Sequence, residues 1–164
     1  MTEPLAQLTL DSPVGPLTVT ARQGAICALR FAAGGPRHSD DPVLQESARQ
    51  ISRYFARQLK AFDLPLDLRG SNHNLVVWHE MLSIPYGETL TYGDIAARIG
   101  SNPRVVGTAC GANPIPLIVP CHRVIGKDGS LVGFSGGDGK KTKARLLDHE
   151  APALPLLSGL MTEL

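Results

Sequence analysis

Cysteine is scarce in this sequence, and its three copies, Cys27, Cys110 and Cys121, show no CxxC spacing. A disulfide framework and a closed zinc site are therefore disfavoured, and free thiols suit a reducing compartment. No stretch approaches the roughly 18 uninterrupted apolar residues of a membrane span. The N-terminus lacks a basic start followed by an apolar run, so no signal peptide is expected. We expect a soluble, cytoplasmic protein without a metal or other cofactor.

Aromatic residues are also few, at 5%, but 43% of the 164 residues are hydrophobic, which suffices for a core without metals or disulfides. The length fits one ordinary domain or two small ones. Residues 98–145 contain eight basic and two acidic residues, whereas the remainder contains eight basic and 13 acidic residues. A basic carboxyl-terminal half favours an anionic partner such as nucleic acid, although a solvated charged face would show the same pattern.

The first 70 residues predict a small α/β domain. Stretches 6–10, 16–21 and 25–31 alternate or are β-branched, and turn residues separate them, which predicts three strands. Apolar residues then recur at helical spacing from Pro42 to about Lys60. The segment "FDLPLDLRGS" is extended and linker-like. We therefore place a boundary near residues 66–72 and divide the chain into domains 1–70 and 71–164.

The second domain is predicted to be mainly helical. One helix, "NLVVWHEMLSI", has an apolar face formed by Leu75, Trp78, Met81 and Leu82. The next begins with a capping-box pattern, Thr91 and Asp94, and stops at Gly100. "SNP" then caps a further helix, with Pro103 at its first position, that runs to about residue 112. Two short helices joined by a glycine-containing turn outline a helix-turn-helix.

The last of these helices is rich in glycine and alanine, which taken alone favours a close helix–helix contact. The proline-rich "NPIPLIVP" that follows leads an extended run into Cys121. "RVIGKDGSLVGF" predicts a hairpin across Lys127, Asp128 and Gly129. A final helix is expected to end near Glu150.

Cys121 stands directly before a histidine and an arginine in "PCHRV". Such a thiol can be a nucleophile, a metal ligand, half of a disulfide or a buried apolar residue. A nucleophilic cysteine needs help to reach its thiolate form. Because neighbours in an extended strand point to opposite faces, His122 can help Cys121 only if the chain bends or a water relays the proton. A buried structural cysteine is the commoner outcome, and we interpret Cys27 and Cys110 in that way.

Several segments taken together resemble the O6-alkylguanine-DNA alkyltransferase family, also called methylated-DNA–protein-cysteine methyltransferases. They are "IPYGETLTYGDIAARIG", "NPIPLIVPCHRVIG", "FSGG" and "LLDHE", with a weaker N-terminal likeness in "DSPVGPLTVTARQGAICALRF". The turn "SNP" is shorter than the family pattern, and His73 and Asn74 stand where an aromatic residue and a glutamine are expected. The resemblance implies an α+β fold. A small ribonuclease H-like α/β domain with an antiparallel sheet would precede a mainly helical, winged helix-turn-helix domain that binds DNA and transfers alkyl groups.

The resemblance also implies direct-reversal DNA repair by base flipping and minor-groove binding. Cys121 would accept the alkyl group irreversibly and in a single turnover. Its main substrate would be O6-alkylguanine, and O4-alkylthymine would be a secondary one. His122 would act as the base through a water, and Glu150 would orient it. Asn113 would hold the turn that carries the site. The partner would be double-stranded DNA bearing O6-alkylguanine. The protein would bind it as a monomer and would not associate with a membrane.

Further residues would contact DNA or the flipped base. Tyr92 would lie near the target nucleotide, and Arg104 would fill the space that the base leaves in the stack. The small residues of the second helix of the helix-turn-helix would approach the minor groove. The full set assigned to DNA or base binding is Tyr92, Arg104, Gly107, Thr108, Gly111, Arg123, Val132 and Ser135.

The sequence also leaves three other classes of function open. A cysteine hydrolase would turn over repeatedly and would more often keep its base far from the cysteine in sequence. A redox sensor would need a resolving cysteine, and none is obvious. The main alternative is a non-catalytic protein that binds alkylation damage. For that function the helix-turn-helix and the basic bias would suffice, and Cys121 would merely be buried.

Overall fold

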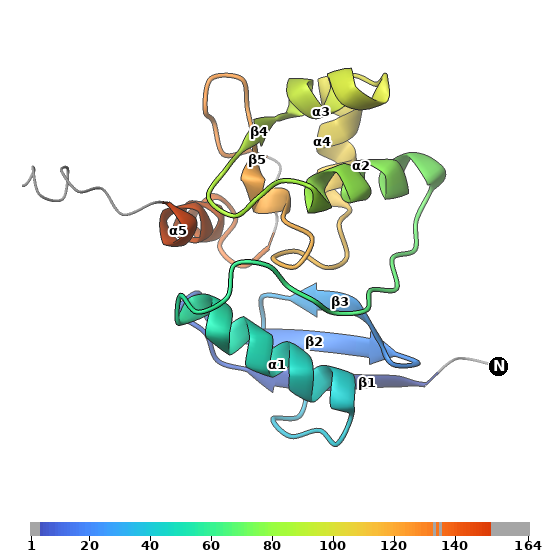
Figure 1. Ribbon diagram of the computed structural model, residues 1–164, viewed down its shortest axis with the longest axis vertical. Coiled ribbons are helices and arrows are strands. Elements are labelled where there is room, and N and C mark those ends of the chain that lie inside the picture. Colours follow the sequence, from blue (N-terminus) through green and yellow to red (C-terminus); the bar gives the residue numbers. More distant parts are fainter. Residues whose placement is uncertain (1–3, 133, 135, 152–164) are drawn as a thin grey trace, which may run out of the picture.

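The computed structural model describes residues 4–132, 134 and 136–151. A three-stranded sheet with one helix on its face forms one half of the molecule, and a group of helices forms the other (Figure 1). The expected α+β fold, with an antiparallel sheet first and helices after it, is confirmed. Among the described residues, no helix is long and apolar enough to cross a membrane.

The sheet is antiparallel, with strand order β1-β2-β3. Its strands are β1 (Leu5–Leu10), β2 (Leu17–Arg22) and β3 (Ala25–Arg30). The register aligns Leu8 with Val19 and Val19 with Leu29, and all three side chains are buried. All three predicted strands are therefore confirmed, because alternation and turn residues are local signals.

Helix α1 (Pro42–Phe55) lies across one face of this sheet (Figure 1). Asp41 caps its first turn by accepting a hydrogen bond from the backbone of Val43. The predicted end near Lys60 is wrong by about one turn. Arg57 has a φ of 62°, in the left-handed region, so the chain leaves the helical path there.

The segment between α1 and the second half is extended, as predicted. The amide of Ile26 donates to Pro65 O at 2.8 Å, and the amide of Asp67 donates to Ile26 O at 2.8 Å, so the segment pairs with β3. One buried core runs through both halves of the molecule. Since packing does not separate the halves, the division into domains 1–70 and 71–164 remains a proposal.

The described residues of the second half form four α-helices and a short pair of parallel strands. They are α2 (Asn72–Leu82), α3 (Tyr92–Ile99), α4 (Pro103–Gly111), α5 (Lys140–Glu150), β4 (Leu90–Thr91) and β5 (Val124–Ile125). On α2, Trp78 and Met81 are buried as predicted, but Leu82 is 40% exposed and Val77 is buried instead. Trp78 Nε1 donates to Ala109 O at 2.8 Å, which ties α2 to α4.

Helices α3 and α4 form the predicted helix-turn-helix. The capping box of Thr91 and Asp94 is present, and Gly100 ends α3 with a φ of 69°. Asn102 then caps α4 by accepting from the backbone of Val105. The short "SNP" turn is therefore closed by a left-handed glycine on one side and a side-chain cap on the other.

The hairpin predicted around Asp128 is wrong for the described residues. A tight turn does form, because the Gly126 amide donates to Ser130 O at 2.8 Å. However, β5 pairs in parallel with β4, placing Val124 opposite Leu90, and not with the residues after the turn. The strand that follows Cys121 is thus joined to the start of α3.

We expect Gly100→Ala to lower the free energy of unfolding by about 1 kcal/mol, because a side chain disfavours the left-handed conformation there. Urea denaturation measures this. Gly111→Ala is the matched control: it lies at the end of α4, and an added Cβ would meet nothing within 4 Å. It should leave stability unchanged or raise it by up to about 1 kcal/mol. An equal loss in both variants would contradict this account of the turn.

Candidate active site

Cys121 opens a single 3-10 turn, η1 (Cys121–Arg123). Pro120 before it has φ −80° and ψ 66°, and the Cys121 amide donates to Val119 O at 2.8 Å. This is an inverse γ-turn. The Arg123 amide then donates to Pro120 O at 3.0 Å. The chain therefore has the bend that cooperation between Cys121 and His122 requires.

Asn113 closes the loop that leads to Cys121. Its Nδ2 donates to Val119 O at 2.9 Å, and its Oδ1 accepts from the amide of Ile115 at 2.9 Å. One amide side chain thus joins the two ends of residues 113–119. The role that the family resemblance implies for Asn113, holding this turn, remains a prediction that these two hydrogen bonds support.

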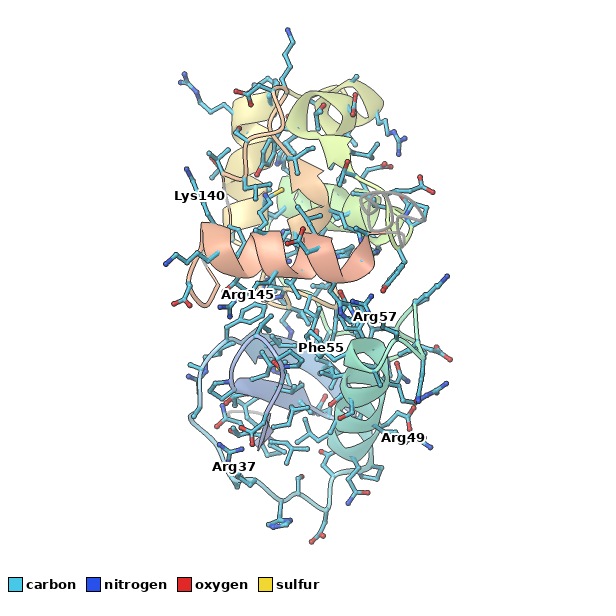
Figure 2. All side chains as sticks on the ribbon, turned by 90° about the vertical axis from the view of Figure 1, so that its left-hand side faces the viewer. Arg37, Arg49, Phe55, Arg57, Lys140 and Arg145 are labelled. Atoms are coloured by element: carbon cyan, nitrogen blue, oxygen red, sulfur yellow. The ribbon has the colours of Figure 1, made fainter. Side chains whose placement is uncertain are left out.

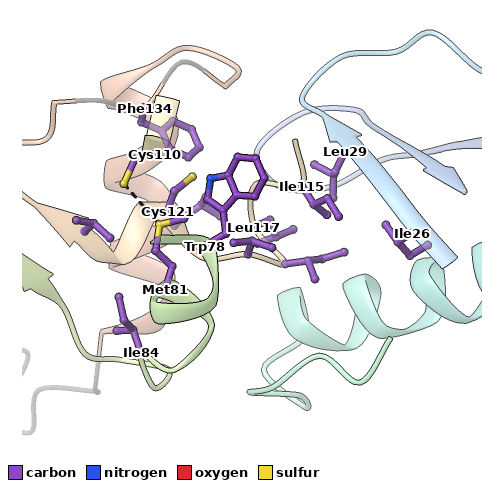
Figure 3. Close-up of a cluster of buried hydrophobic side chains, with 14 of the residues drawn as sticks. Ile26, Leu29, Trp78, Met81, Ile84, Cys110, Ile115, Leu117, Cys121 and Phe134 are labelled. Carbon is purple, nitrogen blue, oxygen red and sulfur yellow. Dashed lines mark hydrogen bonds between the residues drawn. The ribbon is translucent and has the colours of Figure 1, made fainter. Parts of the chain in front are cut away.

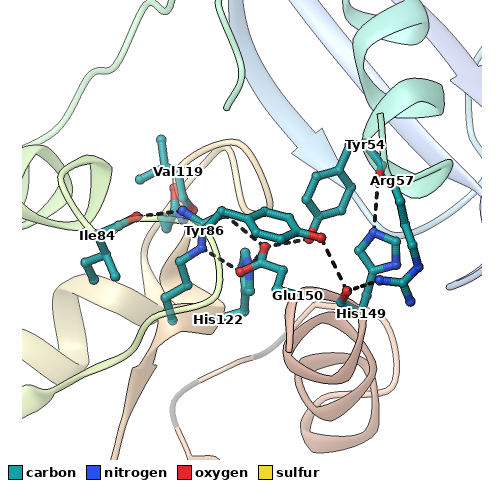
Figure 4. Close-up of polar contacts among 10 residues, drawn as sticks. Tyr54, Arg57, Ile84, Tyr86, Val119, His122, His149 and Glu150 are labelled. Atoms are coloured by element: carbon teal, nitrogen blue, oxygen red, sulfur yellow. Dashed lines mark hydrogen bonds and ion pairs between the residues drawn. The ribbon is translucent and has the colours of Figure 1, made fainter. Parts of the chain in front are cut away.

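His122 and Glu150 are brought together by η1 and the end of α5. His122 Nε2 lies 2.7 Å from Glu150 Oε2 (Figure 4). The side chains of His122 and Glu150 are 0% and 1% exposed. Arg123 adds two hydrogen bonds to the same carboxylate, from Nε at 2.8 Å and from Nη2 at 3.0 Å. Two buried charges and an imidazole therefore form one compact group.

The protonation states of this group follow from its surroundings. Burial lowers the pKa of His122 and outweighs the Glu150 contact, which raises it. Burial also opposes ionisation of Glu150, but hydrogen bonds from His122 and Arg123 outweigh it and hold the pKa of that carboxyl well below its ordinary value. A neutral imidazole then donates from Nε2 to a carboxylate, and Nδ1 is left as the acceptor. Nδ1 is buried and has no hydrogen-bond partner within the described part of the chain.

Cys121 is a neutral thiol in this setting. Burial raises its pKa to about 11, although a hydrogen bond from Asn113 and the charge of Lys143 act in the opposite direction. Activation of Cys121 at neutral pH therefore needs a base. His122 Nδ1 is a free acceptor of the right kind.

A cavity of ≈ 320 Å³ opens beside Cys121 and is walled by both halves of the molecule. Arg30 and Phe31, just at and after β3, form part of the wall, and the Phe31 and Phe134 rings meet edge to face at 5.7 Å. A Cβ on Gly136 would lie 2.5 Å from the Phe31 ring, so glycine lets the two segments approach closely. No local pattern around Arg30 or Phe31 predicts their place at the cavity, because these contacts are long-range.

Lys143 is a third residue that the sequence analysis does not single out. It is fully buried in α5, and its Nζ donates to Val124 O at 2.6 Å, to Val132 O at 2.9 Å and to Tyr92 Oη at 3.4 Å. The Tyr92 hydroxyl donates to Val132 O as well. Lys143 thus joins α5 to α3, to β5 and to Val132. Its helical spacing with the buried Leu146 and Glu150 was a usable signal.

The other two cysteines are buried, as predicted. Cys110 lines the same cavity as Cys121, and its thiol contacts Met81 Sδ at 3.5 Å (Figure 3). Burial raises the pKa of Cys110 to about 12 and also raises the pKa of Cys27.

Helix α4 links this cavity to an exposed surface. Arg104, Thr108 and Gly111 are exposed on it, and Gly111 also lines the cavity. Since an added Cβ on Gly111 would meet nothing within 4 Å, no helix–helix contact explains that glycine. A Cβ on Gly107 would be 3.9 Å from the Tyr92 ring, an ordinary contact.

Three of the residues assigned to DNA or base binding are Arg123, Val132 and Ser135. Arg123 does not fit DNA contact, because it is 7% exposed and its guanidinium is engaged by Glu150 and, at 2.7 Å, by Ile84 O. A charged residue in "CHRV" gave no sign of burial, and we reassign Arg123 to the support of Glu150. The Val132 side chain is 43% exposed, and its backbone oxygen is occupied by Tyr92 and Lys143. Ser135 lies outside the described residues.

Two family models match the chain. The model described as "6-O-methylguanine DNA methyltransferase, ribonuclease-like domain" matches residues 6–68. The model described as "6-O-methylguanine DNA methyltransferase, DNA binding domain" matches residues 72–152.

Curated relatives carry the same kind of name. The methylated-DNA–protein-cysteine methyltransferase of Mycobacterium tuberculosis is 43% identical over 154 residues, which cover 88% of this chain and 93% of the relative. The constitutive methylated-DNA–protein-cysteine methyltransferase of Bacillus subtilis is 37% identical over 154 residues, covering 87% and 93%.

Solved structures agree. The O6-methylguanine methyltransferase of M. tuberculosis has a TM-score of 0.80 at 40% identity, covering 94% of this chain and 99% of that one. The M. tuberculosis OGT in complex with DNA has a TM-score of 0.78 at 45% identity, covering 90% and 96%.

The raised pKa of Cys121 makes a prediction for the free protein. Below the pKa, the thiolate fraction rises about tenfold per pH unit. Modification of Cys121 by iodoacetamide should therefore be slow at neutral pH and accelerate about tenfold per unit up to at least about pH 9, as followed by peptide mass spectrometry. In Asn113→Ala, which loses a donor that lowers this pKa, the reaction at each pH should be slower. A rate that levels off below about pH 8 would contradict a neutral resting thiol.

Proposed function

This chain belongs to the 6-O-methylguanine-DNA methyltransferase family, and on that premise we propose that it repairs alkylated DNA by direct reversal. It transfers the alkyl group of O6-alkylguanine in double-stranded DNA to Cys121 and reacts once. O4-alkylthymine is a secondary substrate. The observation that carries the proposal is the buried contact of 2.7 Å between His122 and Glu150, placed next to a cysteine that opens on a cavity.

The transfer begins with the thiol proton. His122 Nδ1 takes the proton of Cys121 through a water, and the Glu150 carboxylate stabilises the imidazolium that forms. The Cys121 sulfur then attacks the alkyl carbon, a C–S bond forms and the C–O6 bond breaks. The electron pair of that bond passes to the guanine, which takes up one proton, and we assign Tyr92 to the support of this leaving group. A thioether is not easily cleaved, so each molecule acts once.

The base must leave the duplex before Cys121 can reach it, because O6 is inaccessible within the stack. The cavity beside Cys121 receives the flipped base, and the segment of Val132 to Gly136, including Ser135, contacts it. Helix α4 enters the minor groove with Gly107, Thr108 and Gly111, of which Thr108 and Gly111 are exposed. Arg104 replaces the flipped base in the stack. Basic residues contact phosphates without sequence preference.

The protein acts as a cytoplasmic monomer without a cofactor. The alternative, a damage-binding protein without activity, is not favoured, because Cys121 lines a cavity of ≈ 320 Å³ and the next residue, His122, has an acceptor nitrogen with no partner among the described residues. The curated relatives are also named as methyltransferases.

Incubation with duplex DNA that contains O6-methylguanine should add one methyl group to each protein molecule, on the peptide that holds Cys121. Intact-protein and peptide mass spectrometry measure this. Cys110→Ser is the matched control, since Cys110 lines the same cavity; it should still accept one methyl group, whereas Cys121→Ser should accept none. Repeated turnover, or methylation of Cys110 in the unmodified chain, would refute the proposal.

Arg104→Ala should separate base extrusion from simple phosphate binding. If Arg104 replaces the flipped base, its loss should slow repair of a paired lesion far more than repair of a mismatched one, where unpairing costs least. Reaction with free O6-benzylguanine, which needs no extrusion, should be nearly unchanged. Single-turnover rates on the three substrates test this.

The control for that experiment is Lys127→Ala, which removes another exposed cation. Replacement of a residue that only contacts phosphate should weaken binding to all DNA sequences and lower the salt slope of binding by about one unit. If the three rates of Arg104→Ala fall by the same factor, Arg104 is not an extrusion residue.

A further inference from the structure

One hydrogen bond to Glu150 comes from the first half of the chain. The Tyr54 hydroxyl, in the last turn of α1, donates to Glu150 Oε2 at 2.6 Å (Figure 4). His122 Nε2 contacts the same oxygen at 2.7 Å. Among the described residues before position 70, Tyr54 alone donates a hydrogen bond to this carboxylate. Tyr54 and His122 therefore share one oxygen atom of Glu150.

Tyr54 is held rigidly in this position. Its side chain is fully buried, and its ring is surrounded by other rings. These are Phe55 at 4.9 Å, Phe62 at 5.4 Å, Tyr86 at 6.0 Å and His149 at 4.9 Å between centroids. A ring packed in this way cannot swing its hydroxyl to another acceptor without disrupting the core.

The contact is part of a larger junction between α1 and α5. Arg57 Nη1 donates to His149 O at 2.6 Å, and His149 Nε2 lies 2.9 Å from Tyr54 O. Figure 2 shows Phe55 and Arg57 beneath α5, where the two halves of the molecule meet. The end of α1 is therefore fixed against the helix turn that carries Glu150.

We propose that Tyr54 is a positioning residue for alkyl transfer: its hydroxyl holds Glu150 in the orientation that receives His122, so that α1 takes part in the activation of Cys121. This inference rests on the proposed function. It adds a role for the first domain in the reaction itself, beyond its contribution to the cavity wall.

The chemical effect of Tyr54 is on the basicity of the shared oxygen. A hydrogen bond to a carboxylate favours its ionised form. Without the hydroxyl, Oε2 attracts the proton on His122 more strongly, which stabilises the imidazolium and raises the pKa of His122. A protonated His122 cannot accept the Cys121 proton, so transfer is lost first on the acid side. Burial, followed by the charge of Glu150, raises the pKa of Tyr54, so its hydroxyl remains a donor across this range.

Removal of the hydroxyl leaves the charges around the relay in place. The relay consists of Cys121, His122 and Glu150. The titratable and charged groups around it, among the described residues, come from two other segments and from the same two elements: Tyr54 from α1, Tyr86 from the segment after α2, Arg123 from η1, and Lys143 and His149 from α5. Tyr54 is uncharged, so Tyr54→Phe changes a hydrogen bond and no net charge. A shift in the pH profile would then report the missing donor.

The test compares Tyr54→Phe with Tyr86→Phe. Both keep an aromatic ring, but the Tyr86 hydroxyl contacts a backbone oxygen, His149 O, at 3.3 Å. Single-turnover methyl transfer from duplex O6-methylguanine is measured from about pH 5 to about pH 9. In Tyr54→Phe the rate should fall roughly tenfold at neutral pH, and the acid limb should move to higher pH. DNA affinity should not change, and the Tyr86→Phe profile should overlay that of the unmodified protein.

An NMR titration of the His122 imidazole, with no DNA present, separates the two hypotheses. The His122 pKa should be higher in Tyr54→Phe than in the unmodified protein and in Tyr86→Phe. If the unmodified protein transfers no methyl group, the proposed function fails, but this titration still decides the role of Tyr54. An unchanged His122 pKa in Tyr54→Phe would overturn the inference. So would an equal loss of rate at every pH, which would make Tyr54 merely structural.

Discussion

The buried carboxylate of Glu150 is hydrogen-bonded to three side chains, Tyr54, His122 and Arg123. A charge removed from water must be matched by donors, and the loss of a partner leaves it uncompensated. Those donors come from η1 and α1, far from α5 in sequence. Because the pKa of Glu150 is lowered in the folded protein, its ionised form stabilises the fold at pH values above the unfolded pKa of about 4.3. That contribution is lost as the pH falls toward the folded-state value. The same ion thus organises the fold and the chemistry.

Local signals in the sequence predicted the elements well. The strands, the capping box of Thr91 and Asp94, and Pro103 at the start of α4 all depend on residues within one or two turns of each other. The errors arose where distant contacts decide. Residues after the 127–129 turn do not pair with β5, because β4 takes that place. Leu82 is exposed although it fits the apolar pattern, since the neighbouring elements cover Val77 instead.

The same distinction holds at the site. "PCHRV" and "LLDHE" mark Cys121, His122 and Glu150 in sequence, and the structure brings the last two into contact. No sequence pattern near Tyr54 or Phe31 predicts that these residues contact the site, because α1 and the end of β3 reach it only through tertiary packing. Arg123 was misplaced for a related reason: an arginine is expected at the surface unless its acidic partner is known. Lys143 is the intermediate case, since helical spacing with Leu146 indicated its face but not its partners.

The burial that keeps Cys121 protonated has a consequence for a protein that reacts only once. Cells contain many soft electrophiles and oxidants, and each of them consumes thiolates faster than thiols. A neutral, buried thiol reacts slowly with these reagents, whereas a permanently ionised cysteine would be modified before the protein meets its substrate. The cost is a slower intrinsic nucleophile, which the neighbouring imidazole offsets at the moment a base is bound. The burial of this one sulfur atom therefore favours the survival of unreacted protein until it meets damaged DNA.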